Sequence, residues 1–190
     1  MMRASDEVTL AGIMTEAAQR KGLPLIVAVD GRSGVGKSTL ARTLAERVEA
    51  CVIEGDDFYA GGIELRADSA VARAAACIDW TRQRSVLQGL AAGREACWRA
   101  FDWDAFDGRL RDEPTWIGPR PIVILEGVYA ARPELADLLD LLGQAGVQQR
   151  QHPLQPFSPR YFQKGSPLFS FAHEWQVLHQ QGEEQGQGDP

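Results

Sequence analysis

The sequence predicts a three-layer α/β fold built on a parallel sheet, and three observations support that prediction. Short continuous apolar runs at 25–29, 51–53 and 122–125 are typical of strands buried on both faces. A helical segment lies between the first two runs, so the chain order there is strand, helix, strand. Strands connected in this way are parallel, because the connection returns the chain to the same end of the sheet.

Apolar residues at helical spacing predict four helices around these strands. The first covers 5–21 and presents one apolar face for packing. The second follows the first strand through 40–48. The third begins after Asp79, a residue type that can cap a helix. The fourth covers 133–142, where leucines gather on one side.

Residues 101–121 are rich in aromatic, acidic and proline residues and are predicted to form a long ordered loop. Long loops in α/β proteins usually carry function, because a rigid scaffold positions them at the surface. We therefore expect this loop to contribute to a binding site.

Composition excludes several classes of partner. The formal net charge is −6, whereas non-specific nucleic-acid binding needs a basic surface. Asp6 and Glu7 interrupt the apolar core that a signal peptide would need, and no run approaches the roughly 18 apolar residues of a membrane span. We expect a cytoplasmic protein that binds a small molecule and neither nucleic acid nor membrane; the sequence leaves the oligomeric state open.

The turn after the first strand carries the clearest chemical signal. Residues 31–38 satisfy G-x-x-x-x-G-K-[ST], the P-loop motif that binds the phosphates of nucleoside triphosphates. Its glycines let backbone N–H groups turn inward around phosphate oxygens, and the following helix adds its positive N-terminal end. The predicted fold is therefore a P-loop NTPase fold. The expected nucleotide-binding residues are Gly31, Arg32, Ser33, Gly34, Val35, Gly36, Lys37, Ser38 and Thr39.

Two side chains of this motif have distinct chemistry. Lys37 supplies a mobile positive charge for the β- and γ-phosphates, so we expect it to act in catalysis as well as in binding. Ser38 supplies a hydroxyl ligand to Mg²⁺, which prefers hard oxygen donors. The motif thus predicts ATP or GTP, with Mg²⁺, at this site. A dinucleotide-binding loop is a poor alternative, because the glycine spacing fails G-x-G-x-x-G.

Three further motifs follow the P-loop in order. Asp56-Asp57-Phe58-Tyr59 comes after the second strand, residues 101–107 read Phe-Asp-Trp-Asp-Ala-Phe-Asp, and residues 125–129 read Leu-Glu-Gly-Val-Tyr. Together with the P-loop they resemble the uridine kinase and phosphoribulokinase family, and uridine–cytidine kinases in particular. The resemblance covers roughly residues 24–142.

The resemblance implies a role for five residues. Asp56 aligns with the catalytic aspartate that accepts the proton of the acceptor hydroxyl, and Glu126 aligns with a Mg²⁺-associated acid. Tyr59 looks like an aromatic residue of the substrate pocket. Phe101 and Asp102 match positions that stack on a base and bind ribose hydroxyls. For Asp56 the alternative is a loop-capping role, and for Tyr59 it is packing alone.

Asp57, Arg109 and Arg111 are weaker candidates. The family counterpart of Asp57 varies. The two arginines could contact phosphate, but arginines in a loop are more often simply solvated.

The sequence changes character beyond Gly143. Eleven of the fourteen glutamines lie in 144–190, no strand is predicted there, and only 171–181 has helical spacing. The last nine residues are polar and expected to be disordered. We therefore divide the chain into a kinase core, 1–143, and a divergent, partly disordered tail, 144–190. Family members have a further core strand and an arginine-bearing lid in this region.

Two accounts of this tail compete: a divergent kinase with an incomplete lid of its own, or a tail translated out of frame. A uridine- or cytidine-like nucleoside is the acceptor we predict first. Pantothenate, nicotinamide riboside, a sugar phosphate and glycerate remain alternatives within the kinase class. A non-catalytic nucleotide-binding protein is the rival from another class, because lid arginines stabilise the charge that develops during phosphoryl transfer.

Overall fold

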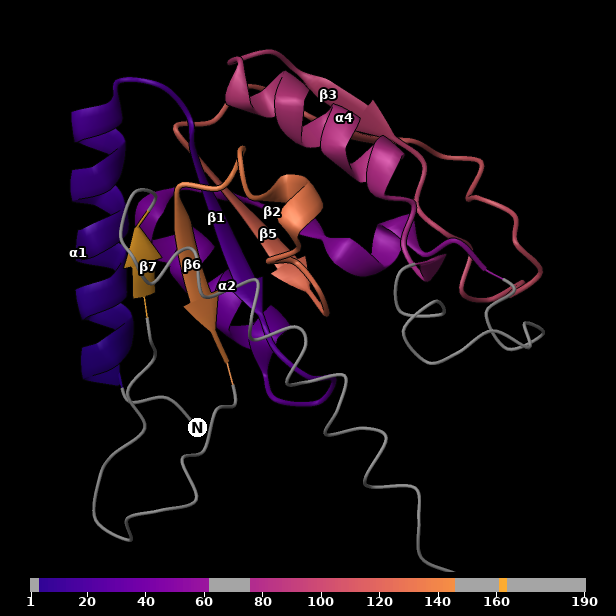
Figure 1. Cartoon of the computed structure of the whole chain (residues 1–190), viewed down its shortest axis with the longest axis horizontal. Coiled ribbons are helices and arrows are strands. Elements are labelled where there is room, and N and C mark those ends of the chain that lie inside the picture. The colour runs from indigo at the N-terminus through magenta and orange to yellow at the C-terminus, as the bar shows by residue number, and fades with distance from the viewer. Residues whose placement is uncertain (1–3, 62–75, 146–160, 164–190) are drawn as a thin grey trace, which may run out of the picture.

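The computed structural model describes residues 4–61, 76–145 and 161–163. A five-stranded sheet forms its centre, in the order β2–β5–β1–β6–β7 (Figure 1). Four strands are parallel: β1 (Leu25–Asp30), β2 (Cys51–Glu54), β5 (Ile122–Gly127) and β6 (Leu141–Gln144). The edge strand β7 (Tyr161–Gln163) is antiparallel to β6. The predicted α/β class with a parallel sheet is confirmed.

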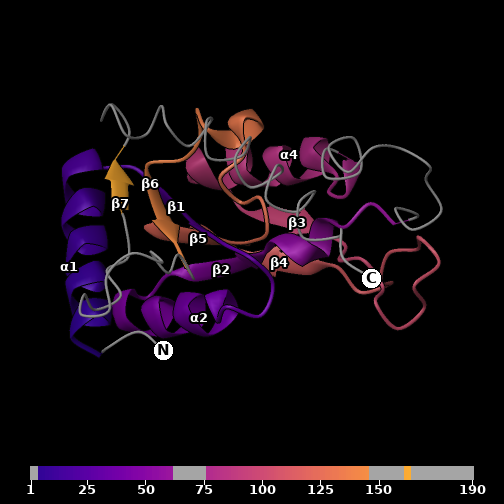
Figure 2. The same cartoon turned by 60° about the horizontal axis from the view of Figure 1, so that its bottom comes forward.

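Helices cover both faces of this sheet (Figure 2). α1 (Ala4–Lys21) and α2 (Lys37–Val48) pack on one face. α4 (Trp80–Ala91) and the short 3-10 helix η3 (Pro133–Leu135) pack on the other. No helix within the described ranges is long and apolar enough to cross a membrane.

Alternation along β1 explains why its first five residues, 25–29, are all apolar. Ile26 and Ala28 belong to the core on the α4 side, whereas Val27 and Val29 belong to the core on the α1 and α2 side. Every residue of β1 and of β5 is buried. A strand covered on both faces is apolar along most of its length, and its polar residues lie at its carboxyl end, as Asp30 does in β1 and Glu126 in β5.

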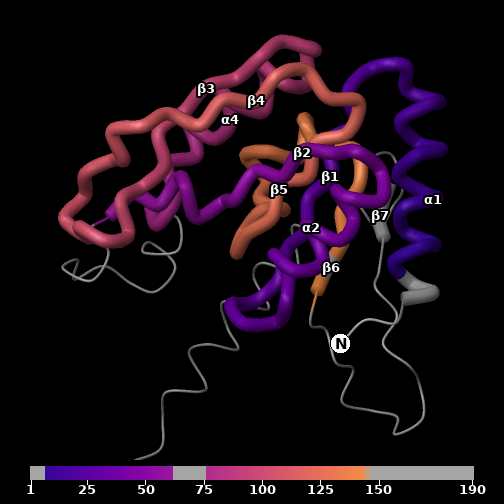
Figure 3. Tube along the Cα trace, turned by 180° about the vertical axis from the view of Figure 1, so that it is seen from behind, coloured from indigo at the N-terminus to yellow at the C-terminus, as the bar shows by residue number. Residues whose placement is uncertain are grey.

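A hairpin beside the sheet was not predicted. β3 (Ala96–Trp98) pairs antiparallel with β4 (Thr115–Ile117), and the two form a separate two-stranded sheet (Figure 3). The expected loop at 101–121 therefore contains a strand. Each strand has three residues, which is too short for an alternating pattern to stand out in the sequence.

The helix predicted at 133–142 is wrong. Helical structure is confined to η3, and β6 begins at Leu141. Asp140 explains the change, because its backbone N–H donates to Ile26 O and its carboxylate accepts the Ile26 N–H, at 2.8 Å each. These bonds start the pairing with β1. The leucines at helical spacing therefore do not form one helix: some pack at or beside η3, and others lie in β6.

The prediction that no strand follows Gly143 is also wrong. β6 pairs with β1 from Leu141 to Gln144 and therefore continues past the division expected at residue 143. β7 then pairs with β6 from within the expected tail. A further core strand, β6, is therefore present, although it was not predicted from the sequence. The predicted helix at 171–181 and the predicted disordered end lie outside the described residues.

Candidate active site

The carboxyl ends of three parallel strands converge on one edge of the sheet. β1 ends at Asp30 and continues through the P-loop into α2, while β2 is followed by the 3-10 helix η1 (Gly55–Phe58). β5 ends at Gly127, opposite Asp30 in register. Polar side chains that follow these strands are therefore brought together, as at the ligand-binding edge of other open α/β sheets.

Glycine is required at the P-loop for steric reasons. Gly34 and Gly36 have φ of 78° and 88°, in the left-handed region that side chains disfavour. Gly31 has φ 149° and lies so close to the carbonyl oxygen of Ala145 that a Cβ could not be accommodated. The predicted loop thus has the tight turns that a phosphate-binding backbone needs.

A cavity of about 280 Å³ opens over this loop. Lys37 is only 7% exposed, and its ammonium group donates to the carbonyl oxygen of Arg32 at 2.9 Å. Among the described residues that line the cavity, Lys37 is the only cation. The lining residues are Ser33, Gly34, Gly36, Lys37, Ser38, Thr39, Asp56, Glu126, Gly127 and Val128.

Glu126 faces the first turn of α2. The hydroxyl of Ser38 donates to Glu126 Oε1 at 3.0 Å. A Cβ on Gly55 would lie 2.9 Å from the carbonyl oxygen of Glu126, so glycine at position 55 allows the ends of β2 and β5 to approach closely. This approach places Asp56 and Glu126 on the same cavity.

The two carboxyl groups of the cavity resist ionisation. Burial raises the pKa of Glu126, and the Ser38 hydrogen bond and the Lys37 charge oppose that shift. Burial also raises the pKa of Asp56; Lys37 again opposes the shift, and Glu54 adds to it. A bound cation would relieve this cost. A serine hydroxyl beside a carboxylate is an oxygen donor set of the kind that Mg²⁺ prefers, so Ser38 and Glu126 fit a magnesium site.

Four aromatic rings cluster beyond Asp56. Tyr59 stacks on Trp103 with ring centroids 5.0 Å apart, and Phe101 meets both rings edge to face. Phe106 stacks with Tyr59 at 6.3 Å. Phe101 is 1% exposed, whereas Trp103 is 43% and Phe106 is 50% exposed. The exposed aromatic surface is thus formed by Trp103 and Phe106, neither of which was singled out from the sequence of their motif.

Asp102 and Asp57 are engaged in structural contacts. Asp102 Oδ1 accepts the backbone N–H groups of Asp104 and Ala105, each at 3.1 Å, and so caps a turn. Asp57 Oδ2 accepts the indole N–H of Trp98 at 2.7 Å and holds β3 in place. A contact of Asp102 with ribose hydroxyls stays a prediction, and one of its oxygens is already used.

The two loop arginines pair with neighbouring acids. Arg109 forms an ion pair with Asp107, and Arg111 lies 3.8 Å from Asp104. Both are more than half exposed. Neither lines the cavity over the P-loop.

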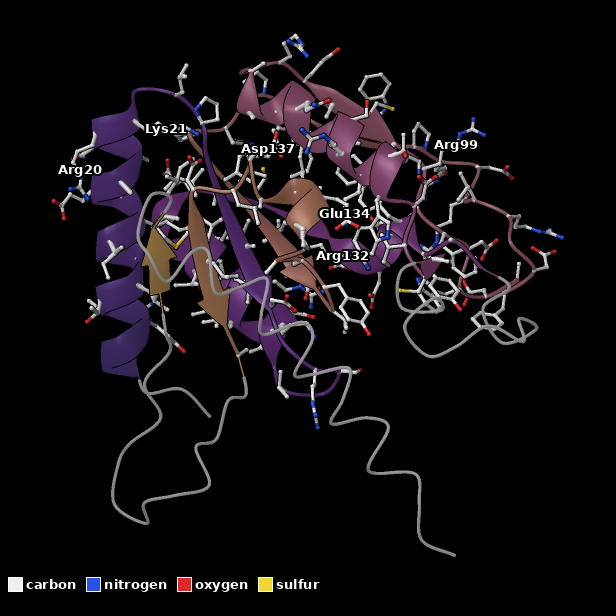
Figure 4. All side chains as sticks on the ribbon, viewed as in Figure 1. Arg20, Lys21, Arg99, Arg132, Glu134 and Asp137 are labelled. Atoms are coloured by element: carbon white, nitrogen blue, oxygen red, sulfur yellow. The ribbon has the colours of Figure 1, made fainter. Side chains whose placement is uncertain are left out.

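The segment after β5 is fixed against α4 by cation–π and ionic contacts (Figure 4). The guanidinium carbon of Arg132 lies 4.3 Å from the ring centroid of Trp80, and its nitrogens pair with Glu134. Arg84 of α4 pairs in turn with Asp137. These contacts hold the chain where it leaves the cavity.

Asp30 was not predicted as a site residue. Its carboxylate is 3% exposed and accepts three backbone N–H groups around the start of the P-loop. The signal was present, because an aspartate directly follows the buried run 25–29. It was overlooked because the expected strand ended one residue earlier.

No family model matches this chain, and no curated protein matches it. Solved structures do match. A possible uridine kinase from Bacillus stearothermophilus superposes with a TM-score of 0.58 and 17% identity, over 74% of this chain and 83% of that one. A protein named as a putative fructose transport system kinase from Silicibacter sp. TM1040 gives 0.56 and 21%, over 73% and 75%.

A D-glycerate 3-kinase from Cryptococcus neoformans is similar over a smaller share of its length. The TM-score is 0.52 at 18% identity, over 68% of this chain and 54% of that one, so this chain spans about half of that kinase. The three proteins match this chain in overall fold. The fold of this chain is therefore that of the P-loop kinases.

Proposed function

We propose that this chain is a small-molecule kinase that transfers the γ-phosphoryl group of ATP or GTP to a hydroxyl group of a uridine- or cytidine-like nucleoside. One observation carries the proposal. Lys37 and Ser38 of the P-loop line the same cavity as the carboxylates of Asp56 and Glu126. Phosphoryl transfer needs a phosphate cradle, a magnesium site and a group that orients the hydroxyl, and this cavity combines residues suited to all three.

The donor half of the reaction falls to the P-loop. Gly34 and Gly36 would turn their backbone N–H groups toward phosphate oxygens. Lys37 would exchange its hydrogen bond with the Arg32 carbonyl for contacts with the β- and γ-phosphates. Ser38 and Glu126 would hold Mg²⁺, which when bound neutralises charge on the phosphates.

The acceptor half falls to Asp56. Its carboxylate faces the cavity beside the P-loop, where it can orient a hydroxyl group and accept its proton. Asp56 is an exposed residue, but partial desolvation at the cavity raises its pKa, and a carboxylate with a raised pKa is a stronger base than one in water. The raised pKa therefore favours proton transfer to Asp56.

The aromatic cluster favours an acceptor that carries a flat ring. Tyr59 lies three residues after Asp56, and the exposed faces of Trp103 and Phe106 adjoin it. A nucleobase could stack on these rings. Nicotinamide riboside would satisfy the same requirement, whereas pantothenate, glycerate and a sugar phosphate have no aromatic ring to stack.

A second candidate function is nucleotide binding without turnover. One observation favours it: Lys37 is the only cation among the described residues that line the cavity. Kinases stabilise the charge of the transition state with further cations, often arginines. Arg150, Arg160 and Lys164 lie outside the residues whose side chains the structure describes.

A panel of acceptors tests the proposal. ADP formation is followed with Mg·ATP and, in separate reactions, uridine, cytidine, nicotinamide riboside, pantothenate, glycerate and a sugar phosphate. The proposal predicts that uridine or cytidine has the highest kcat/KM. If an acceptor without an aromatic ring reacted faster, that compound and not the nucleoside would be the substrate. ATP binding without reaction on any acceptor would support the second candidate.

A further inference from the structure

Asp30 occupies a central place at the end of the sheet. It is the last residue of β1, opposite Gly127 of β5 on one side and Gln144 of β6 on the other. Its side chain is buried, so it does not reach the solvent of the cavity, and it does not line that cavity. Its role must therefore come from its contacts with other parts of the chain.

Both carboxylate oxygens of Asp30 accept backbone hydrogen bonds. Oδ1 accepts the N–H of Gly31 at 2.6 Å and that of Tyr129 at 3.1 Å, and Oδ2 accepts that of Ala131 at 3.1 Å. The first donor begins the P-loop. The other two belong to the post-β5 turn (residues 128–131), which directly follows Glu126 and Gly127.

The backbone around Asp30 completes this junction. The carbonyl oxygen of Asp30 accepts the N–H of Ala145 at 2.8 Å, which attaches the end of β6. Tyr129 has φ 67°, a conformation that residues other than glycine rarely adopt. Such a conformation persists only where its surroundings hold it, and the hydrogen bond from Tyr129 N–H to Asp30 is one such restraint.

Packing alone does not explain an aspartate at this position. A buried anion is costly, and this one lies next to a loop suited to binding phosphate. Burial raises the pKa of Asp30, while the three N–H groups and Lys37 oppose the shift. An aliphatic residue would avoid the cost of burial, but it could not hold three backbone groups in fixed directions.

We propose that Asp30 is a positioning residue that fixes the P-loop and the post-β5 turn relative to each other, and so sets the approach of Glu126 to Ser38 and Lys37. The consequence for nucleotide binding rests on the proposed function. The mechanical part of the proposal does not, because it concerns hydrogen bonds within the chain.

Asp30→Asn is the variant that tests this role. The amide is almost isosteric with the carboxylate, but its NH₂ group cannot accept a backbone N–H, so at least one of the three bonds is lost. Asp140→Asn is the matched control. Asp140 ties the opposite end of β1, where its carboxylate accepts the Ile26 N–H and the ammonium group of Lys21.

Two measurements are made on the full chain. Amide hydrogen exchange without nucleotide reports the post-β5 turn directly, and titration with Mg·ATP reports the site. Asp30→Asn should speed exchange at Tyr129 and Ala131 and weaken Mg·ATP binding by about 10- to 100-fold, the usual cost of losing a residue that orients a binding group. Asp140→Asn should leave both at wild-type values.

Several outcomes would overturn the proposal. Wild-type exchange at Tyr129 and Ala131 in Asp30→Asn would show that Asp30 does not hold the turn. An equal loss of Mg·ATP affinity in Asp140→Asn would mean that the loss in Asp30→Asn reflects a general decrease in stability and not the positioning of the P-loop. If the wild type binds no Mg·ATP, the proposed function fails, and the exchange comparison still decides whether Asp30 positions the turn.

Wild-type protein provides a measurement that does not depend on folding of the variant. The N–H groups of Tyr129 and Ala131 lie in a turn, where amides ordinarily exchange quickly. If Asp30 holds them, they should exchange as slowly as those of β1. Rapid exchange at both amides in the wild type would contradict the proposal.

Discussion

The hydroxyl of Ser38 donates a 3.0 Å hydrogen bond to the carboxylate of Glu126, although 88 residues separate them in sequence. Adjacent strands bring them together: β1 leads through the P-loop to Ser38, and β5 ends next to Glu126. The pair joins the nucleotide-binding motif to an acid from a different part of the chain. Much of the proposed chemistry depends on this relationship.

Replacing Glu126 with glutamine should separate magnesium binding from folding. The amide oxygen of the glutamine can still accept the Ser38 hydroxyl, but the side chain provides no negative charge for a cation. We expect Glu126→Gln to weaken Mg·ATP binding by about 10- to 100-fold, the cost of one charge-assisted contact. Calorimetric titration with ATP, once in the presence of Mg²⁺ and once in the presence of EDTA, measures this change in affinity. Equal Mg²⁺ dependence in variant and wild type would remove Glu126 from the site.

The stability of this variant relative to the wild type should depend on pH. Burial raises the pKa of Glu126, so its contribution to stability is fully present below the ordinary carboxyl pKa, about 4, and is lost as pH rises through the raised value. Glu126→Gln has no ionisable group at this position, so it does not lose stability in this way as pH rises. It should be more stable than the wild type by about 0.5–2 kcal/mol near pH 8 and by less near pH 5.

Urea unfolding at several pH values checks that prediction. The expected gap between variant and wild type widens from acidic to neutral pH. A gap that instead widens toward acidic pH would mean that the pKa of Glu126 is lowered in the folded protein.

Removal of the Lys37 ammonium group should affect binding more than folding. Lys37→Ala loses one hydrogen bond to the Arg32 carbonyl and, in the proposed complex, the charge that meets the phosphates. We expect Mg·ATP affinity to fall about 10- to 100-fold. Arg42→Ala is the control, since Arg42 lies on α2 with its side chain 64% exposed and pairs with Glu54. Unchanged affinity in Lys37→Ala would refute the P-loop assignment.

Leu142 tests the presence of β6 in the core. Its side chain is 1% exposed, so Leu142→Ala should destabilise the protein by about 2–5 kcal/mol in urea unfolding. Leu23→Ala is the matched control, because Leu23 is 61% exposed and its loss should cost less than about 0.5 kcal/mol. Similar stabilities of the two variants would contradict a core position for residues 141–144.

The strands of the sheet were predicted best where burial is complete. The runs at 25–29 and 122–125 were recognisable because these parts of β1 and β5 are buried on both faces and contain only apolar residues. The region 133–142 was misread because Leu135, Leu138, Leu139 and Leu142 fit helical spacing. The bonds between Asp140 and Ile26 that begin β6 join residues 114 apart, and no local pattern reveals such a contact.

The residues of the candidate site likewise divide into those that a local sequence pattern predicts and those whose roles depend on the folded chain. Residues of the P-loop could be predicted because steric and charge requirements fall within eight consecutive positions. The burial of Phe101 beneath Trp103 and Phe106 depends on how a loop folds on itself, and the use of Asp102 to cap a turn does too. Asp30 could have been noticed as an acid after a buried strand, but two of its three donors come from a segment distant in sequence.

The most direct test of the proposed kinase activity compares wild type with Asp56→Asn. Phosphorus NMR follows ATP, Mg²⁺ and uridine or cytidine with each protein, and Mg·ATP affinity is measured in parallel. The proposal predicts a new phosphomonoester signal with the wild type. It predicts a rate about 10²–10⁴-fold lower with Asp56→Asn, the usual effect of losing a positioned base, at similar ATP affinity. An Asp56→Asn protein as active as the wild type, or a wild type that binds ATP and yields no phosphomonoester with any acceptor of the panel, would contradict it.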